Sequence, residues 1–184
     1  MAKNVEIKAR LTKSQFQQVA GRAAELAERG PLELEQCDTF FHSKSGRLKL
    51  REFADGSAEL IHYHRDDQAG PKSSGYALIP CPDPTALKAA LAAANGIRGV
   101  VKKQRTVYFT GPTRIHLDRV EGLGDFLELE VVVEAGRSCE PGAIEQGEPP
   151  SKEDPVGLAH RLMDQLGIEP SMLVATAYID LLAR

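Results

Sequence analysis

The stretch that decides the fold of this chain is Asn4-Val5-Glu6-Ile7-Lys8-Ala9-Arg10-Leu11. Polar and apolar side chains alternate along it, which is the period of a β-strand with two chemically different faces. The polar face carries a carboxylate, Glu6, beside an ammonium group, Lys8. An edge strand with one solvated face would show the same alternation, so this stretch alone leaves a surface strand and a functional strand both open.

A second strand pattern repeats this mixture late in the chain. It reads Phe126-Leu127-Glu128-Leu129-Glu130-Val131 and places two carboxylates on one face, two positions apart. If this strand faces the strand that carries Glu6 and Lys8, the pair would hold a divalent cation next to an anion site lined by cations.

Length and composition favour one soluble domain. The chain has 184 residues, which fits a single domain over residues 1–184 with a sizeable core. The net charge of −3 gives no basic field, so we expect neither a nucleic-acid nor a membrane partner. Cys37, Cys81 and Cys139 lie far apart, which indicates free thiols in a reducing compartment. Without a signal-peptide pattern or an apolar run of about 18 residues, we expect a cytoplasmic protein.

Three segments show helical spacing with start and stop signals. They lie between Thr12 and Gly30, between Asp83 and Gly96, and between Asp154 and Gly167. Thr12 and Gln15 have the spacing of a capping box, and the other two segments begin with Asp-Pro. Residues 136–153 are rich in Gly, Pro, Glu and Ser and predict a long, mobile surface loop.

Alternating segments predict strands in the remainder of the chain. Besides the first, they lie at residues 36–42, 47–51, 58–65, 76–79, 100–109, 113–118 and 126–134. Most have charges on one face and apolar residues on the other. Helices with apolar stripes need an apolar surface, so the apolar strand faces should lie outside, beneath the helices. The sequence therefore predicts a mainly β (α+β) fold, an eight-stranded antiparallel β-barrel or tunnel with peripheral helices.

In such a barrel the charged faces converge on the lumen. They carry Lys8, Arg51, Arg65, Lys103, Arg105 and Arg114 together with Glu6, Asp118, Glu128 and Glu130. Buried charges of both signs are unfavourable unless they pair or bind a ligand. A polyphosphate suits this lining, because the cations bind its oxygens and carboxylate-held Mg²⁺ or Mn²⁺ neutralises the remaining charge.

In these motifs the sequence resembles the CYTH family of triphosphate tunnel metalloenzymes, and within it the CyaB-like class IV adenylate cyclases. The family signature is an N-terminal Glu-x-Glu-x-Lys strand, basic residues on successive strands and a late Glu-x-Glu strand. The matching segments are residues 4–8, 47–51, 103–105, 114–118 and 126–130. The first Glu of the signature is Asn4 here, a neutral residue, which leaves open whether one or two metal ions bind.

The resemblance implies roles for individual residues. It implies triphosphate binding by Lys8, Arg51, Arg65, Lys103, Arg105 and Arg114. It implies Mg²⁺ or Mn²⁺ ligation by Glu6, Asp118, Glu128 and Glu130. Lys8, Arg105 and Glu128 would serve catalysis. For each basic residue, an exposed charge or an ion pair between strands remains the alternative interpretation.

The activity implied by the resemblance is that of an adenylate cyclase, which converts ATP to cyclic AMP and pyrophosphate. A triphosphatase acting on inorganic or organic triphosphate, such as thiamine triphosphate, is the alternative. A third hypothesis is a polyphosphate-binding or nucleotide-binding module without turnover, and a homodimer is compatible with the sequence.

Several other reactive or aromatic residues are interpreted as structural. His116 is expected to fill the lumen, with a role as acid or base as the alternative. His62 and His64 share a strand face but have no evident third metal ligand. Tyr63 and Tyr178 are expected in the core.

Overall fold

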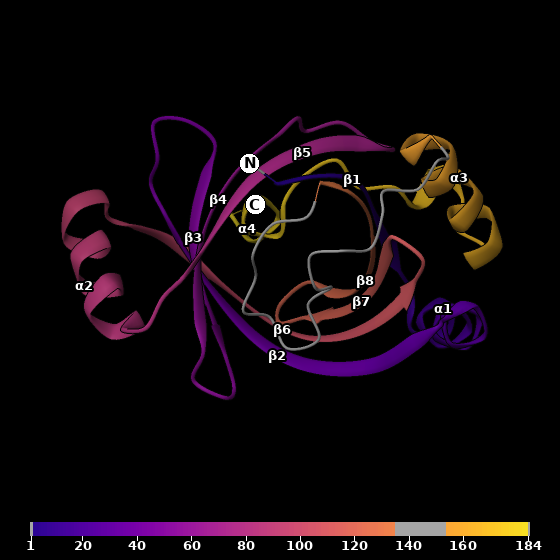
Figure 1. Ribbon diagram of the computed structural model, residues 1–184, viewed down its shortest axis with the longest axis horizontal. Helices are drawn as coiled ribbons and strands as arrows, with labels where there is room; N and C mark the ends of the chain where they lie inside the picture. The colour runs from indigo at the N-terminus through magenta and orange to yellow at the C-terminus, as the bar shows by residue number, and fades with distance from the viewer. Residues whose placement is uncertain (1, 135–153, 184) are drawn as a thin grey trace.

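A closed antiparallel barrel forms the centre of the computed structural model, which describes residues 2–134 and 154–183. Its strands are β1 (Ala2–Leu11), β2 (Arg29–Phe41), β3 (Arg47–Phe53), β4 (Ala58–Arg65), β5 (Lys72–Pro80), β6 (Ile97–Thr110), β7 (Thr113–Val120) and β8 (Gly124–Glu134). Their order around the ring is β1-β5-β4-β3-β2-β6-β7-β8, and pairing of β8 with β1 closes it (Figure 1). The predicted eight-stranded antiparallel barrel with peripheral helices is confirmed.

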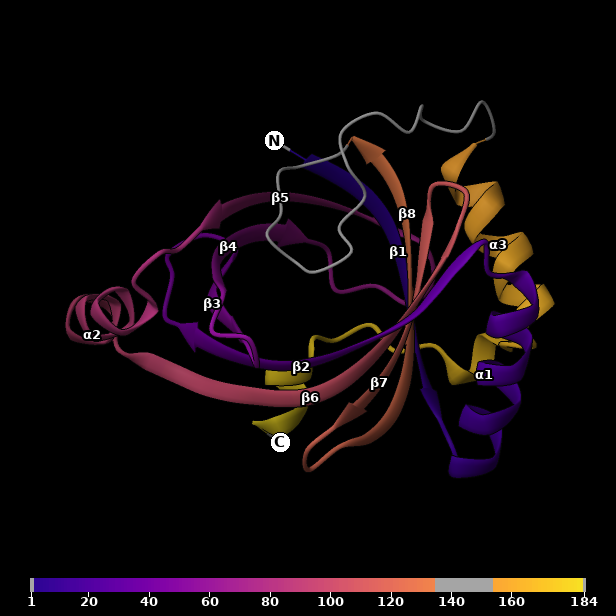
Figure 2. The same ribbon diagram turned by 60° about the horizontal axis from the view of Figure 1, so that its bottom comes forward.

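In the described part of the chain, three helices cover the outside of the barrel. Helices α1 (Lys13–Leu26) and α3 (Pro155–Leu166) lie on one side and α2 (Pro84–Asn95) on the other (Figure 2). The apolar faces of β1, β7 and β8 pack beneath α1 and α3, with Ile7, Ile115 and Leu129 fully buried. Leu50 of β3 is buried in a smaller cluster with Leu87 of α2. The apolar strand faces therefore lie outside, as predicted, and the charged faces are left to the lumen.

The helix ends follow their sequence signals. The Thr12 side chain accepts a hydrogen bond from the Gln15 backbone N–H, and the Thr12 backbone N–H donates one to the Gln15 side-chain oxygen at 2.8 Å. Asp83 and Asp154 cap α2 and α3, each followed by proline at the first helical position. Gly167 ends α3 in the left-handed conformation, with φ of 72°.

Two strands begin well before the residues predicted for them. β2 begins at Arg29 and not near Gln36, and the Gly30-Pro31 pair lies at an irregularity in its pairing with β6. Proline is tolerated there because it has no ladder hydrogen bond to lose. β5 begins at Lys72 and not at Tyr76, because Lys72 to Tyr76 pair with β1. The sequence of one segment does not show which other strand it pairs with.

The C-terminal segment closes part of the lumen. After the short helix η1 (Pro170–Met172), Val174 donates a backbone hydrogen bond to the Lys8 carbonyl at 2.9 Å. Helix α4 (Tyr178–Leu182) follows. Residues on the inner strand faces pack here against the C-terminal segment and form a hydrophobic cluster, which we call the plug. The plug consists of Phe40, Val101, Val120, Phe126, Ala177, Tyr178 and Ile179. Asp180 anchors α4 through ion pairs with Arg47, at 2.8 Å, and with Arg98.

Two expectations fall outside what the structure addresses. The predicted loop at 136–153 lies outside the described residues, and the single-domain prediction remains a prediction. Among the helices of residues 2–134 and 154–183, none combines the length and apolar character needed to cross a membrane.

Candidate functional site

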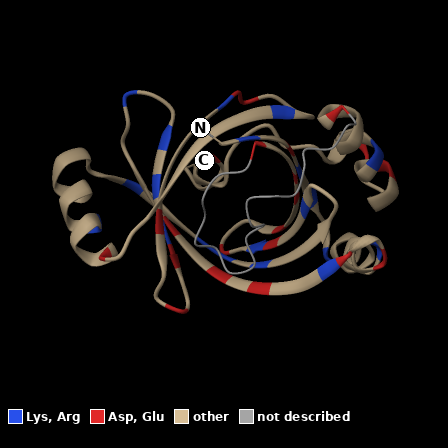
Figure 3. Ribbon diagram, viewed as in Figure 1, with Lys and Arg blue, Asp and Glu red and all other residues tan. Residues whose placement is uncertain are grey.

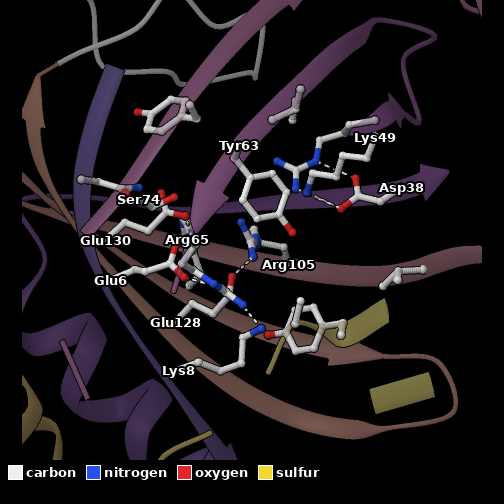
Figure 4. A pocket seen from close by; sticks show the side chains of 18 of the residues that line it. Glu6, Lys8, Asp38, Lys49, Tyr63, Arg65, Ser74, Arg105, Glu128 and Glu130 are labelled. Atoms are coloured by element: carbon white, nitrogen blue, oxygen red, sulfur yellow. Dashed lines mark hydrogen bonds and ion pairs between the residues drawn. The ribbon is translucent and has the colours of Figure 1, made fainter. Parts of the chain in front are cut away.

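The inner strand faces enclose a cavity that is partly open to solvent. Figure 3 shows charges of both signs along the strands of the ring. All six predicted triphosphate-binding residues line the cavity: Lys8, Arg51, Arg65, Lys103, Arg105 and Arg114. Three predicted metal ligands, Glu6, Glu128 and Glu130, line it as well. The prediction that these charged faces meet in one cavity is confirmed, and Figure 4 shows several of these side chains together.

Glu128 joins two of the cations. One of its oxygens lies 3.1 Å from the Lys8 Nζ, and the other accepts a hydrogen bond from Arg105 at 2.6 Å. Burial alone would raise the pKa of the Glu128 carboxyl, but Lys8 and Arg105 outweigh it and hold that pKa well below its ordinary value. Burial also lowers the pKa of Lys8, even with Glu128 beside it. Glu128 is therefore a carboxylate and the centre of a buried ion-pair network.

Asp118 lies behind Arg105 and does not line the cavity. It is fully buried, and its two oxygens accept hydrogen bonds from Arg105, both at 2.7 Å. The Tyr178 hydroxyl donates to the same carboxylate at 3.0 Å, and the Tyr178 ring lies under the Lys8 ammonium, 3.7 Å from the ring centroid to Nζ. This geometry favours a role for Asp118 in holding Arg105, although the sequence predicts it to be a metal ligand.

Arg65 contacts the carboxylates of Glu6 and Asp67, and Arg114 contacts that of Glu130. Arg65 donates to Glu6, and its Nη2 lies 3.8 Å from an Asp67 oxygen, but its buried Nε and Nη2 atoms have no hydrogen-bond partner among the described residues. Arg114 lies 3.7 Å from Glu130, and burial raises the pKa of the Glu130 carboxyl in spite of that neighbour. Unsatisfied guanidinium donors in a closed space are unfavourable unless a ligand accepts from them.

His116 joins Glu128 and Glu130 as a group that can hold a metal ion. One ligand atom from each of these residues lies within 4.8 Å of the others. His116 is 1% exposed, and neither ring nitrogen has a hydrogen-bond partner among the described residues. Burial and the nearby Arg105 lower the pKa of His116 well below its ordinary value, so the ring is neutral. A neutral imidazole beside two carboxyl groups could supply a nitrogen ligand to a divalent cation, which is an alternative to the expected role of His116 as a lumen filler.

A second charged group, centred on Asp38, lies on β2, β3 and β6. The Asp38 carboxylate accepts hydrogen bonds from Lys49 at 2.8 Å and from Arg51 at 2.8 and 3.1 Å, and lies 3.6 Å from Lys103. Although burial opposes it, the attraction of these cations holds the pKa of Asp38 well below its ordinary value. Burial and the charge of Arg51 lower the pKa of Lys49 to about 7. Three cations thus share one carboxylate.

Asn4 lines the same cavity. It is 4% exposed, and its side-chain oxygen has no hydrogen-bond partner among the described residues. Where the CYTH signature has a carboxylate, this chain therefore presents a buried neutral acceptor that remains available to a ligand.

Sequence reasoning missed some lining residues. Asp38, Lys49, Glu59 and Tyr178 all line the cavity. The alternation of β2 and β3 would have placed Asp38 opposite Arg51, had their register been known. Conversely, His62 and His64 lie outside the cavity. The His62 Nε2 is 2.9 Å from the Ser45 carbonyl oxygen, and the His64 Nε2 is 3.3 Å from the Ser45 hydroxyl oxygen. Cys37 and Cys81 are partly buried free thiols, and Cys139 lies outside the described residues.

Comparisons with known proteins identify a family and several structures of the same fold. Residues 2–154 match a protein family described as CYTH domain. No curated protein matches the chain in sequence. Among solved structures, a protein from Pyrococcus horikoshii OT3 has a TM-score of 0.72 at 23% identity, covering 97% of this chain and 98% of that chain. A candidate adenylate cyclase from Vibrio parahaemolyticus has a TM-score of 0.69 at 18% identity, with 98% of both chains covered.

A further similar structure carries a description of activity. It is a candidate adenylyl cyclase from Hippeastrum, described as revealing a dominant triphosphatase activity. Its TM-score is 0.63 at 14% identity, covering 100% of this chain and 95% of that chain. At these identities the similar structures establish a shared fold.

Proposed function

This chain belongs to the CYTH family, and we propose that it is a divalent-metal-dependent enzyme that acts on a triphosphate. One observation carries the proposal: cations from β1, β3, β4, β6 and β7 line a single cavity that also holds a group able to bind a metal ion. The buried, unsatisfied donors of Arg65 support it, because phosphate oxygens would accept from them.

Some residues of the site would bind the triphosphate or the metal ion, and Asp118 orients one of them. Lys8, Arg65 and Arg105 would bind phosphate oxygens on one side of the cavity, and Lys49, Arg51, Lys103 and Arg114 would add further positive charge. Asp118 fixes the Arg105 guanidinium in one orientation before a ligand arrives, so less ordering is needed on binding. His116, Glu128 and Glu130 would hold Mg²⁺ or Mn²⁺. When bound, that ion supplies positive charge to the phosphate oxygens.

Of the two reactions, we favour the adenylate cyclase. The ribose 3′-hydroxyl oxygen of ATP forms a bond to the α-phosphorus, the bond to pyrophosphate breaks, and the hydroxyl proton is released. The resemblance to CyaB-like sequences supports this choice, as does the description of the Vibrio structure. Asn4 supports it as well, because a site with one carboxylate fewer is less suited to activating a hydrolytic water.

The alternative is a triphosphatase, in which water attacks the terminal phosphorus and orthophosphate leaves. The activity described for the Hippeastrum protein favours it. Both reactions use the same cations and differ in which phosphorus lies opposite the nucleophile. A module that binds triphosphate without turnover is the third hypothesis, motivated by the missing carboxylate at Asn4.

Product analysis separates the three hypotheses. The protein is incubated with ATP and Mn²⁺, and separately with inorganic triphosphate and thiamine triphosphate. Cyclic AMP with pyrophosphate supports the cyclase, and orthophosphate supports the triphosphatase. Tight triphosphate binding in calorimetry without product from any substrate supports the binding module. Absence of both binding and turnover would overturn the proposed function.

A further inference from the structure

One part of the cavity has an apolar surface that the charged site does not explain. Ile61, Tyr63, Tyr76 and Leu78 line the cavity from the inner faces of β4 and β5. They form two cross-strand pairs, Ile61 with Leu78 and Tyr63 with Tyr76. We refer to these four side chains as the β4–β5 wall.

The wall is distinct from the hydrophobic cores. Ile61, Tyr76 and Leu78 belong to none of the hydrophobic clusters formed by the described residues, and Tyr63 packs at the edge of the plug. Ile61 and Tyr76 are 6% and 9% exposed, so they are shielded by the barrel while they face its cavity. A hydrated polyphosphate gains nothing from such a surface, whereas an organic ring does.

The position of the wall suits a group attached to a phosphate. The next inward pair on the same strands is Arg65 with Ser74, two residues from Tyr63 and Tyr76. At roughly 3.4 Å per residue, the wall begins about 7 Å from Arg65 along the strand and extends for another 7 Å or so. Asn4 pairs with Ser74 on the other side, so its unpartnered oxygen lies next to the start of the wall.

We propose that the β4–β5 wall is a specificity subsite for the nucleoside portion of a nucleoside triphosphate, an inference that rests on the proposed function. The tyrosine rings offer flat surfaces for a base, and Ile61 and Leu78 add apolar contact. The Asn4 amide, with an acceptor and donors, suits the polar edge of a base or a ribose hydroxyl. Inorganic triphosphate would use the cations alone and leave the wall uncovered.

Calorimetric titrations with ATP and with inorganic triphosphate, both in EDTA to prevent turnover, test this subsite. Tyr76→Ala should weaken ATP binding by about five- to a hundredfold, the usual loss for a base-stacking residue, and leave inorganic triphosphate binding unchanged. Tyr76→Phe keeps the ring and should keep ATP affinity. Leu60→Ala, a truncation on the outer face of β4, should alter neither affinity and is the matched control.

The result that overturns the subsite is an equal effect of Tyr76→Ala on both ligands, or no effect on either. If Tyr76→Ala weakens the binding of thiamine triphosphate in a parallel titration but leaves ATP binding unchanged, the nucleoside assignment is overturned. Should Tyr76→Ala not fold, the unaltered protein provides the test: ATP binding should have a more negative heat-capacity change than inorganic triphosphate binding, because apolar surface is buried. Equal heat-capacity changes would contradict the subsite. Failure of both ligands to bind even when Mn²⁺ replaces EDTA would instead contradict the proposed function.

Discussion

The Tyr178 hydroxyl donates a hydrogen bond of 3.0 Å to the carboxylate of Asp118, a residue 60 positions earlier in the chain. That carboxylate holds Arg105 through two further hydrogen bonds, and the Tyr178 ring lies under Lys8. A side chain from the C-terminal helix therefore orients two cations of the cavity at once. The segment that plugs the barrel is in this way part of the site.

Tyr178→Phe separates the two contacts, because it removes the hydroxyl and retains the ring. With one hydrogen bond to Asp118 lost, Arg105 is less well oriented, and we expect kcat/KM for the triphosphate to fall about tenfold. The free energy of unfolding should fall by only about 1 kcal/mol. Steady-state kinetics and urea unfolding check this. Tyr108→Phe, which alters a tyrosine on the outer face, is the control. Equal kinetics for the two variants would rule out the orienting role.

Asp38→Asn tests the charge balance of the second charged group. The substitution replaces the carboxylate that contacts Lys49, Arg51 and Lys103 with a neutral amide, and loss of one partner from a buried ion pair destabilises by about 3–5 kcal/mol. Inorganic triphosphate should restore much of the lost stability, because it replaces the missing negative charge. Thermal unfolding with and without the ligand measures this. The exposed Asp66→Asn should behave like the unaltered protein. If the ligand raises the unfolding temperature of Asp38→Asn no more than that of Asp66→Asn, the triphosphate does not replace the charge of Asp38.

Lys49 should make triphosphate binding depend on pH. Its folded-state pKa of about 7 lies below the ordinary 10.5, so the unfolded chain binds more protons between these values and this group makes stability rise with pH there. A bound triphosphate raises the Lys49 pKa again, because its negative charge favours the ammonium form. We therefore expect binding above pH 7 to take up a proton and to strengthen as the pH falls toward that value.

Calorimetry in buffers of different ionisation enthalpy measures this proton uptake. Lys49→Arg keeps the positive charge but does not titrate in this range, so the difference between the two proteins isolates the lysine from the ligand's own protons. Identical proton uptake in both would show that Lys49 is already charged in the free protein.

Asn4→Glu restores the carboxylate of the CYTH signature. Because the Asn4 oxygen is buried, unpartnered and at the cavity surface, a carboxylate there should face the site and tighten Mn²⁺ binding. Hydrolysis should rise if a weakly activated water limits it. Ser73→Glu adds the same charge on the outer face of β5, next to β1, and should leave Mn²⁺ affinity unchanged. Equal Mn²⁺ affinity in the two variants would argue against Asn4 as a metal-site position.

The sequence predicts the charged lining well because the two-residue period of a strand fixes which side chains share a face. This period alone predicts that Lys8, Arg105 and Glu128 lie on the polar faces of their strands, and all three line the cavity. The pairing of Asp38 with Arg51 depends on the register of β2 and β3. The start of β5 at Lys72 depends on its pairing with β1. The contact of Asp118 with Tyr178 joins distant segments. Whether the ring nitrogens of His116 find hydrogen-bond partners depends on the residues packed around them, and the pattern of one strand does not reveal that packing.

The central claim is that this cavity acts on a triphosphate with the help of a metal ion, and the rate of ATP consumption tests it most directly. It is measured with Mn²⁺ and with EDTA, for the unaltered protein and for Glu128→Gln, which keeps the side-chain shape but removes the charge that joins Lys8 and Arg105. We predict consumption that requires Mn²⁺ and falls at least about a hundredfold in Glu128→Gln, or about 2.7 kcal/mol in barrier height. Metal-independent consumption, or equal rates for the two proteins, would contradict the account.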